Sequence, residues 1–136
     1  MKPASQSKDL HSAVELFERG ITLFNRRAFF ECHEMLEELW RPERGERRLF
    51  LQGVIHLAVG FYHHQQGNQA GAERQLRKGL KKLAGYLPEF EGLNTVRLYG
   101  EGFECLEQIR QGATLTGYPE ITPASRIAES PQPTRR

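Results

Sequence analysis

Apolar residues recur every three or four positions along most of the chain, the spacing that places them on one face of an α-helix. The pattern predicts five helices, over residues 9–25, 28–41, 46–66, 68–87 and 94–111. No stretch alternates regularly between apolar and polar residues, and no Asn-Gly or Asp-Gly pair marks a hairpin between strands. The sequence therefore predicts an all-α fold.

The predicted helices differ in how they bury their apolar side chains. The third is apolar on all sides through its middle, so we expect it to be the central helix. Single stripes are expected to be buried on the first helix (Leu10, Val14, Phe17, Ile21 and Phe24), the fourth (Ala72, Leu76, Leu80, Leu83 and Leu87) and the fifth (Val96, Tyr99, Phe103 and Leu106). These features predict a compact bundle of about five helices.

The first four helices form two similar pairs in the sequence. Gly60, Gly67 and Ala72 have the spacing of small residues in a tetratricopeptide-type pair, where they let two helices approach closely. In the first pair Ala28 matches Gly67 and His33 matches Ala72. We therefore expect antiparallel helix hairpins, although two pairs are fewer than a repeat array needs.

The length of 136 residues fits one domain. We assign residues 1–111 to a single helical domain. The remainder, residues 112–136, is rich in proline and poor in apolar residues, so we expect an extended or disordered tail. Cys32 and Cys105 lie inside helical patterns and not in a C-x-x-C pair, which indicates buried reduced thiols.

The charges are nearly balanced, with 19 basic and 17 acidic residues and a net charge of +2. This balance gives no general attraction to nucleic acid or to an anionic membrane. The fourth helix has a basic face, formed by Arg74, Arg77, Lys78 and Lys81, but no aromatic residues alternate with these charges. We interpret it as a solvated face and expect no nucleic-acid partner.

The chain shows no sequence feature of membrane insertion or secretion. Its N-terminal segment lacks the apolar stretch of a signal peptide. The longest apolar run, residues 49–62, is short for a bilayer and contains Gln52 and His56. We therefore expect a cytoplasmic protein without a membrane partner.

The candidate site consists of polar residues on the buried faces of helices two and three. His33 lies on the same face as Phe29, Leu36 and Trp40, and Glu37 lies one turn beyond His33 at its edge. Arg48, Gln52 and His56 follow one another every four residues along helix three. Because buried polar groups without partners cost roughly 1–3 kcal/mol each, we expect His33 and Glu37 to face Gln52 and His56.

Three interpretations of this cluster remain open. It is a hydrogen-bonded network that fixes the helix register, the lining of a ligand pocket, or a divalent metal site formed by His33, Glu37 and His56 with Gln52, His63 or water. The H-E-x-x-E spacing differs from the H-E-x-x-H of zinc proteases, and no nucleophile elbow or phosphate-binding loop is present. We favour a partner- or ligand-binding domain without a cofactor; the alternative is a metal-dependent enzyme. The partner is an unknown protein, a small molecule or a second copy of the chain.

Three sequence segments together resemble a known family. They are F-F-E-C-H-E-M-L-E-E-L-W, R-L-F-L-Q-G-V-I-H-L-A and G-N-Q-A-G-A, and they lie between about Leu16 and Leu83. Similar H-E-x-L-E-x-x-W and F-L-Q-G-x-I patterns occur in the small helical family catalogued as domain of unknown function 309. The resemblance implies an all-helical fold. It does not imply any particular activity, because the name of the family records that none is assigned. His56 stands where glutamine is common in that family, so a metal site that includes His56 is not implied.

Overall fold

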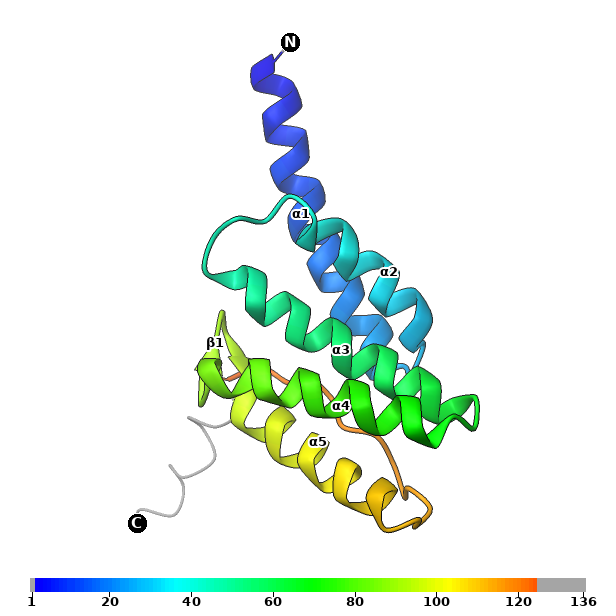
Figure 1. Ribbon diagram of the computed structural model, residues 1–136. Helices are drawn as coiled ribbons and strands as arrows, with labels where there is room; N and C mark the ends of the chain where they lie inside the picture. Colours follow the sequence, from blue (N-terminus) through cyan, green and yellow to red (C-terminus); the bar gives the residue numbers. More distant parts are fainter. Residues whose placement is uncertain (1, 125–136) are drawn as a thin grey trace, which may run out of the picture.

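The computed structural model describes the backbone of residues 2–124 and the side chains of residues 12–124. Within these residues the α-helices are α1 (Lys2–Asn25), α2 (Phe29–Trp40), α3 (Arg47–Gln65), α4 (Gln69–Leu83) and α5 (Thr95–Arg110). A short 3-10 helix, η1 (Ala84–Tyr86), and two short strands, β1 (Glu89–Phe90) and β2 (Leu93–Asn94), lie between α4 and α5. The helical bundle predicted from the apolar periodicity is confirmed (Figure 1).

The central position of α3 is confirmed as well. It packs against α2 on one side and α4 on the other, while α1 covers α2 and α5 packs against α4 (Figure 1). The largest fully buried side chains include Phe50 and Phe61 of α3, Phe24 of α1 and Phe29 of α2. The rings of Phe24, Phe29 and Phe61 contact one another with centroids 5.2–6.2 Å apart. This aromatic cluster joins the two hairpins α1–α2 and α3–α4.

The two hairpins turn in the same way, but the match between them differs by one residue from the expected one. Arg27 and Gly67 both have positive φ angles, of 68° and 81°. The next residue in each turn donates its N–H back to the preceding helix, at 2.9 Å for Ala28 and 2.8 Å for Asn68. Ala28 therefore corresponds to Asn68, and the fully buried Cys32, not His33, corresponds to Ala72.

The apolar stripes of two helices also differ from the prediction. On α5, Val96 and Phe103 are 44% and 47% exposed, and the buried residues are Thr95, Leu98, Gly102, Cys105, Leu106 and Ile109. Two apolar faces compete on this helix, and Gly102 lets one of them approach Leu80 closely. On α1, Val14 is 58% exposed and lines a surface pocket with Phe17 and Ile21.

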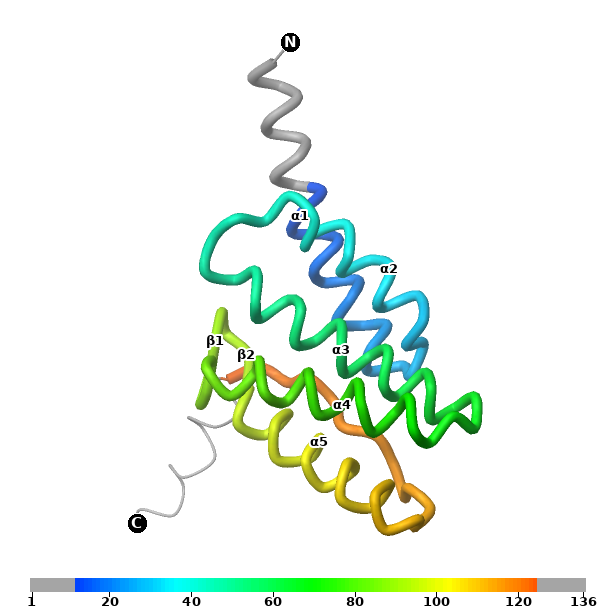
Figure 2. The backbone as a smooth tube through the Cα atoms, in the orientation of Figure 1, coloured from blue at the N-terminus to red at the C-terminus, as the bar shows by residue number. Residues whose placement is uncertain are grey.

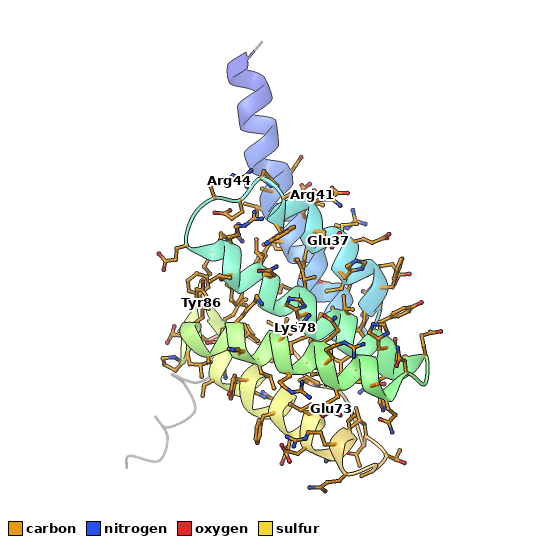
Figure 3. The ribbon with its side chains drawn as sticks, viewed as in Figure 1. Glu37, Arg41, Arg44, Glu73, Lys78 and Tyr86 are labelled. Atoms are coloured by element: carbon orange, nitrogen blue, oxygen red, sulfur yellow. The ribbon has the colours of Figure 1, made fainter. Side chains whose placement is uncertain are left out.

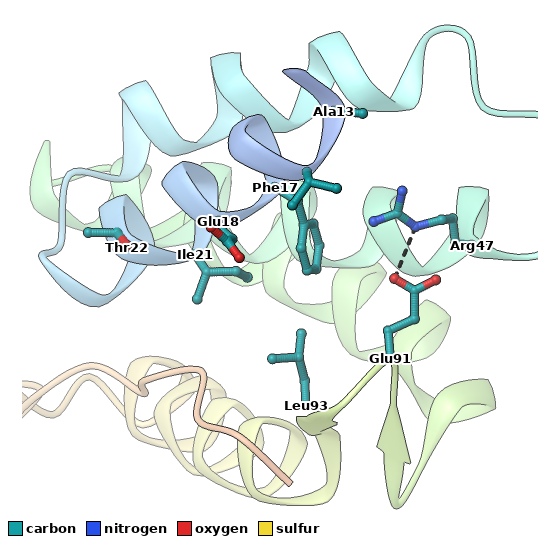
Figure 4. A pocket seen from close by; sticks show the side chains of 9 residues that line it. Ala13, Phe17, Glu18, Ile21, Thr22, Arg47, Glu91 and Leu93 are labelled. Atoms are coloured by element: carbon teal, nitrogen blue, oxygen red, sulfur yellow. Dashed lines mark ion pairs between the residues drawn. The ribbon is translucent and has the colours of Figure 1, made fainter. Parts of the chain in front are cut away.

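The hairpin β1–β2 was not predicted from the sequence. Its two-residue turn is Glu91–Gly92, and both residues have positive φ angles, of 50° and 79°. Such turns favour Asn-Gly or Asp-Gly, so a glutamate at the first turn position did not predict a hairpin. An ion pair of 3.2 Å joins Glu91 to Arg47 at the start of α3 (Figure 4).

The segment after α5 packs against the bundle. Asn25 of α1 exchanges two hydrogen bonds with the backbone of Ile121, at 2.7 and 3.0 Å. The Tyr118 ring contacts Phe29 and Phe61 in the core. The packed domain therefore extends to residue 124 (Figure 2), and the rest of the expected tail, residues 125–136, lies outside the described residues.

Candidate functional site

The candidate residues of α2 interact with one another along the surface of that helix. The Nδ1–H group of His33 donates to the carbonyl oxygen of Phe30 at 3.0 Å. His33 Nε2 lies 3.7 Å from a carboxylate oxygen of Glu37, whose other oxygen lies 3.4 Å from Arg41 (Figure 3). The side chains of His33 and Glu37 are 21% and 35% exposed. Both are half-buried, whereas His33 was expected inside the buried stripe and Glu37 at its edge.

Trp40 and Arg48 join the end of α2 to the start of α3. The guanidinium carbon of Arg48 lies 4.1 Å from the centre of the Trp40 ring. The same guanidinium group donates to the carbonyl oxygens of Trp40 at 2.7 Å and Glu43 at 2.8 Å. Because the last carbonyl groups of a helix lack partners within it, these bonds stabilise the connection after α2. This geometry supports a structural role for Trp40 and Arg48.

His56 and Gln52 of α3 belong to a groove on the side of α4. His56 Nδ1 lies 2.7 Å from the side-chain oxygen of Gln75 in α4. The groove has a volume of about 980 Å³ and is lined by Glu46, Leu49, Gln52, His56, Lys78, Lys81, Lys82, Gly85 and Tyr86. We call this the α3–α4 groove. At its floor, Gly79 packs so closely on α3 that a Cβ atom there would lie 2.8 Å from the carbonyl oxygen of Gly53.

The α3–α4 groove is positively charged. Among the side chains of residues 12–124, none forms an ion pair with Lys78, Lys81 or Lys82. Burial lowers the pKa of His56, and the positive charges of Lys82 and Lys78 lower it further, while the hydrogen bond to Gln75 has the opposite effect. At neutral pH the imidazole of His56 is therefore uncharged, and it shares the groove lining with three lysines.

We expected His33 and Glu37 to face Gln52 and His56, but the hydrogen bonds of the two histidines lead to different helices. His33 is bonded within α2, whereas His56 is bonded to α4. Within the described part of the chain, no group of three or more His, Cys, Asp or Glu side chains is placed to hold a metal ion. The candidate metal set of His33, Glu37 and His56 is thus not assembled. The reason is the register of α2, in which Cys32 and Leu36 take the buried positions.

Five residues that line the α3–α4 groove were not singled out from the sequence: Glu46, Leu49, Lys82, Gly85 and Tyr86. Gln75, the hydrogen-bond partner of His56, was not singled out either, and Lys78 and Lys81 were interpreted as part of a solvated face. Gln75, Lys78 and Lys82 follow one another at three- and four-residue intervals, which places them on one side of α4. This spacing is visible in the sequence, but it does not tell which helix that side faces.

The two cysteines are free and buried, which confirms the expectation for them. Burial raises the pKa of Cys32 to about 12 and that of Cys105 to about 11. Both thiols therefore stay protonated at neutral pH, and neither is activated as a nucleophile. Of the described helices, none has the length and apolar character needed to cross a membrane.

Comparison with known proteins identifies the class of this helical domain. Residues 17–75 match the model of a family described as Domain of unknown function (DUF309). The resemblance based on the His33 and Gln52 motifs is thereby confirmed. An uncharacterized protein of Bacillus subtilis (strain 168), YpuF, is 34% identical over 97 residues, which are 70% of this chain and 55% of YpuF.

A second relative is an uncharacterized protein of Aquifex aeolicus (strain VF5). It is 25% identical over 109 residues, which are 79% of this chain and 32% of the relative. The chain thus spans about half or less of the length of the curated relatives that it matches. Neither relative's description gives an activity, so a function must be argued from the geometry of this chain.

Proposed function

We propose that this chain is a cytoplasmic binding domain that recognises an acidic partner protein through the α3–α4 groove. The observation that carries the proposal is that Lys78, Lys81 and Lys82 line this groove together with His56, and that none of them forms an ion pair with a side chain of residues 12–124. Like charges held close together repel one another and cost free energy. A partner that brings carboxylates into the groove relieves this repulsion.

The groove also offers contacts other than charge. Leu49, on its wall, is 52% exposed, which is high for a large apolar side chain. Gln52 presents an amide group that can both donate and accept hydrogen bonds. An acidic protein segment with an apolar side chain matches this combination, since protein interfaces typically surround an apolar contact with polar groups.

A nucleic acid fits the groove less well. Binding of single strands usually relies on exposed aromatic rings that stack on bases. Among the described residues that line the groove, Tyr86 alone is a phenylalanine, tyrosine or tryptophan. Its hydroxyl donates to the carbonyl oxygen of Glu46 at 2.8 Å and its ring packs against Phe50 and Phe90.

The proposal is tested by measuring the fluorescence anisotropy of a labelled glutamate-rich peptide as the protein is added. Lys78→Glu should weaken binding at least about tenfold, because it places a negative charge inside the groove. Arg74→Glu is the matched control: it makes the same charge change one turn earlier on α4, at an exposed residue outside the groove lining. The control should weaken binding at most about threefold, because Arg74 lies outside the groove lining and does not face the bound peptide.

Two results would overturn the proposal. One is equal weakening by Lys78→Glu and Arg74→Glu, which would show attraction to the whole basic helix and not to the groove. The other is tighter binding of a single-stranded oligonucleotide than of the peptide, with the same dependence on Lys78. Circular dichroism spectra of each variant should match the parent, because both substitutions are at exposed positions.

A further inference from the structure

The α2 helix carries a set of charges opposite to that of the α3–α4 groove. Glu31, Glu34 and Glu38 are exposed on α2, and none of them forms an ion pair with another side chain among residues 12–124. Phe30, on the same helix, is 43% exposed. The molecule thus has two exposed surfaces of opposite charge, each beside an exposed apolar side chain.

These two surfaces lie on opposite sides of the central helix. α2 packs along one side of α3 and α4 along the other. A rotation by half a turn about an axis parallel to α3 therefore exchanges the positions of the acidic and the basic helix.

From this arrangement we propose that the acidic partner of the α3–α4 groove is α2 of a second copy of this chain. The proposal rests on the function proposed above and names the partner. In a dimer with this twofold axis, α2 of each copy lies over the groove of the other, so the same contact is made twice. A contact that two copies make reciprocally closes on itself, as in most homo-oligomers, and does not extend into a filament.

The spacing of the charges fits such a contact. Glu34 and Glu38 are one helical turn apart, about 6 Å, as are Lys78 and Lys82. Two helices can therefore pair these carboxylates and ammonium groups along their length. Phe30 and Leu49 supply the apolar contact, whose burial from water favours association. Because the charges lie at the surface, the association should weaken as salt is added.

The experiment is sedimentation velocity of the full chain between about 1 µM and about 1 mM protein, a range that covers weak association. Two variants reverse the charge of one surface each: Glu34→Lys with Glu38→Lys, and Lys78→Glu with Lys81→Glu. We expect the parent to dimerise more weakly at about 0.5 M than at about 0.05 M salt. Each variant alone should dimerise at least about tenfold more weakly, since like charges then face each other.

Mixing the two variants should restore a dimer made of one copy of each, because the acidic surface of one then meets the basic surface of the other. A chain with all four reversals should again form a homodimer. The matched control is Glu104→Lys with Glu120→Lys, two exposed glutamates outside both surfaces, which should dimerise like the parent. The mixing result is specific, because a variant that merely misfolded could not regain a partner.

Several results would overturn the inference. They are a parent that stays monomeric at low salt, a dimer that survives both charge reversals, or variants that fail to associate when mixed. If the parent is monomeric but still binds the acidic peptide through Lys78, the proposed binding function stands and only the second copy as partner is refuted. If neither association nor peptide binding occurs, both proposals fail.

Discussion

Replacing Gly79 with alanine should force α3 and α4 apart at the floor of the α3–α4 groove. The added Cβ atom would lie 2.8 Å from the carbonyl oxygen of Gly53 and 2.9 Å from a methyl carbon of Leu57. The first of these neighbours is backbone, which cannot turn away as a side chain can. Overpacking of this kind typically costs about 1–3 kcal/mol of folding free energy.

Alanine also favours the helix over glycine, by up to about 1 kcal/mol, which hides part of this cost. Gly100→Ala is the control that removes the ambiguity. Gly100 is exposed on α5 and a Cβ atom there has no neighbour within 4 Å, so this variant gains the helix preference without the clash. The difference in unfolding free energy between the two variants is therefore the overpacking cost alone.

The assay is urea unfolding of the parent and both variants, followed by circular dichroism. Gly100→Ala should be more stable than the parent, and Gly79→Ala should be less stable than Gly100→Ala by about 1–3 kcal/mol, which is roughly 3–10 °C in melting temperature. Equal stabilisation by both substitutions would show that α3 and α4 can separate without cost. The predicted overpacking cost at Gly79 would then be refuted.

Three further outcomes follow from named contacts. Arg48→Met should lower the unfolding free energy by about 1–3 kcal/mol, because two carbonyl groups lose a charged donor; an unchanged urea midpoint would contradict this role. Asn25→Ala should cost a similar amount, about 1–3 kcal/mol, and should increase hydrogen exchange at Ile121, since it removes both bonds that hold that residue. The lowered pKa of His56 means that its contribution to stability is complete above its usual value of 6.5 and is lost as the pH falls below it. His56→Gln should therefore lose less stability than the parent between about pH 7 and about pH 5, and an identical pH dependence would contradict this.

Most of the fold can be predicted from the sequence because helix formation depends on local spacing. The central position of α3 follows from a run that is apolar on all sides, and the tight turn at Gly67 follows from a residue that adopts positive φ easily. The stripe of α5 could not be predicted in the same way. That helix has two apolar faces, and only the approach of Leu80 to Gly102 selects the one that is buried.

The candidate site was predicted in part. The sequence pointed to His56 and Gln52, and both line the α3–α4 groove. It also predicted that they face His33 and Glu37, which instead lie half-buried along α2. A difference of one residue in the register turns a side chain by about 100°, so Cys32 is buried and His33 is half-exposed.

The amino-acid sequence by itself thus determined the helical class, the hairpin order and the match of residues 17–75 to a family of unknown function. These properties depend on periodicity and on short motifs, which are local along the chain. The tertiary structure alone decided that His56 pairs with Gln75, 19 residues away, and that three lysines of α4 line the same groove as His56. Which charged and hydrogen-bonding side chains of two helices meet depends on the rotation of each helix about its axis. Packing sets that rotation, and it does so only when the whole core forms.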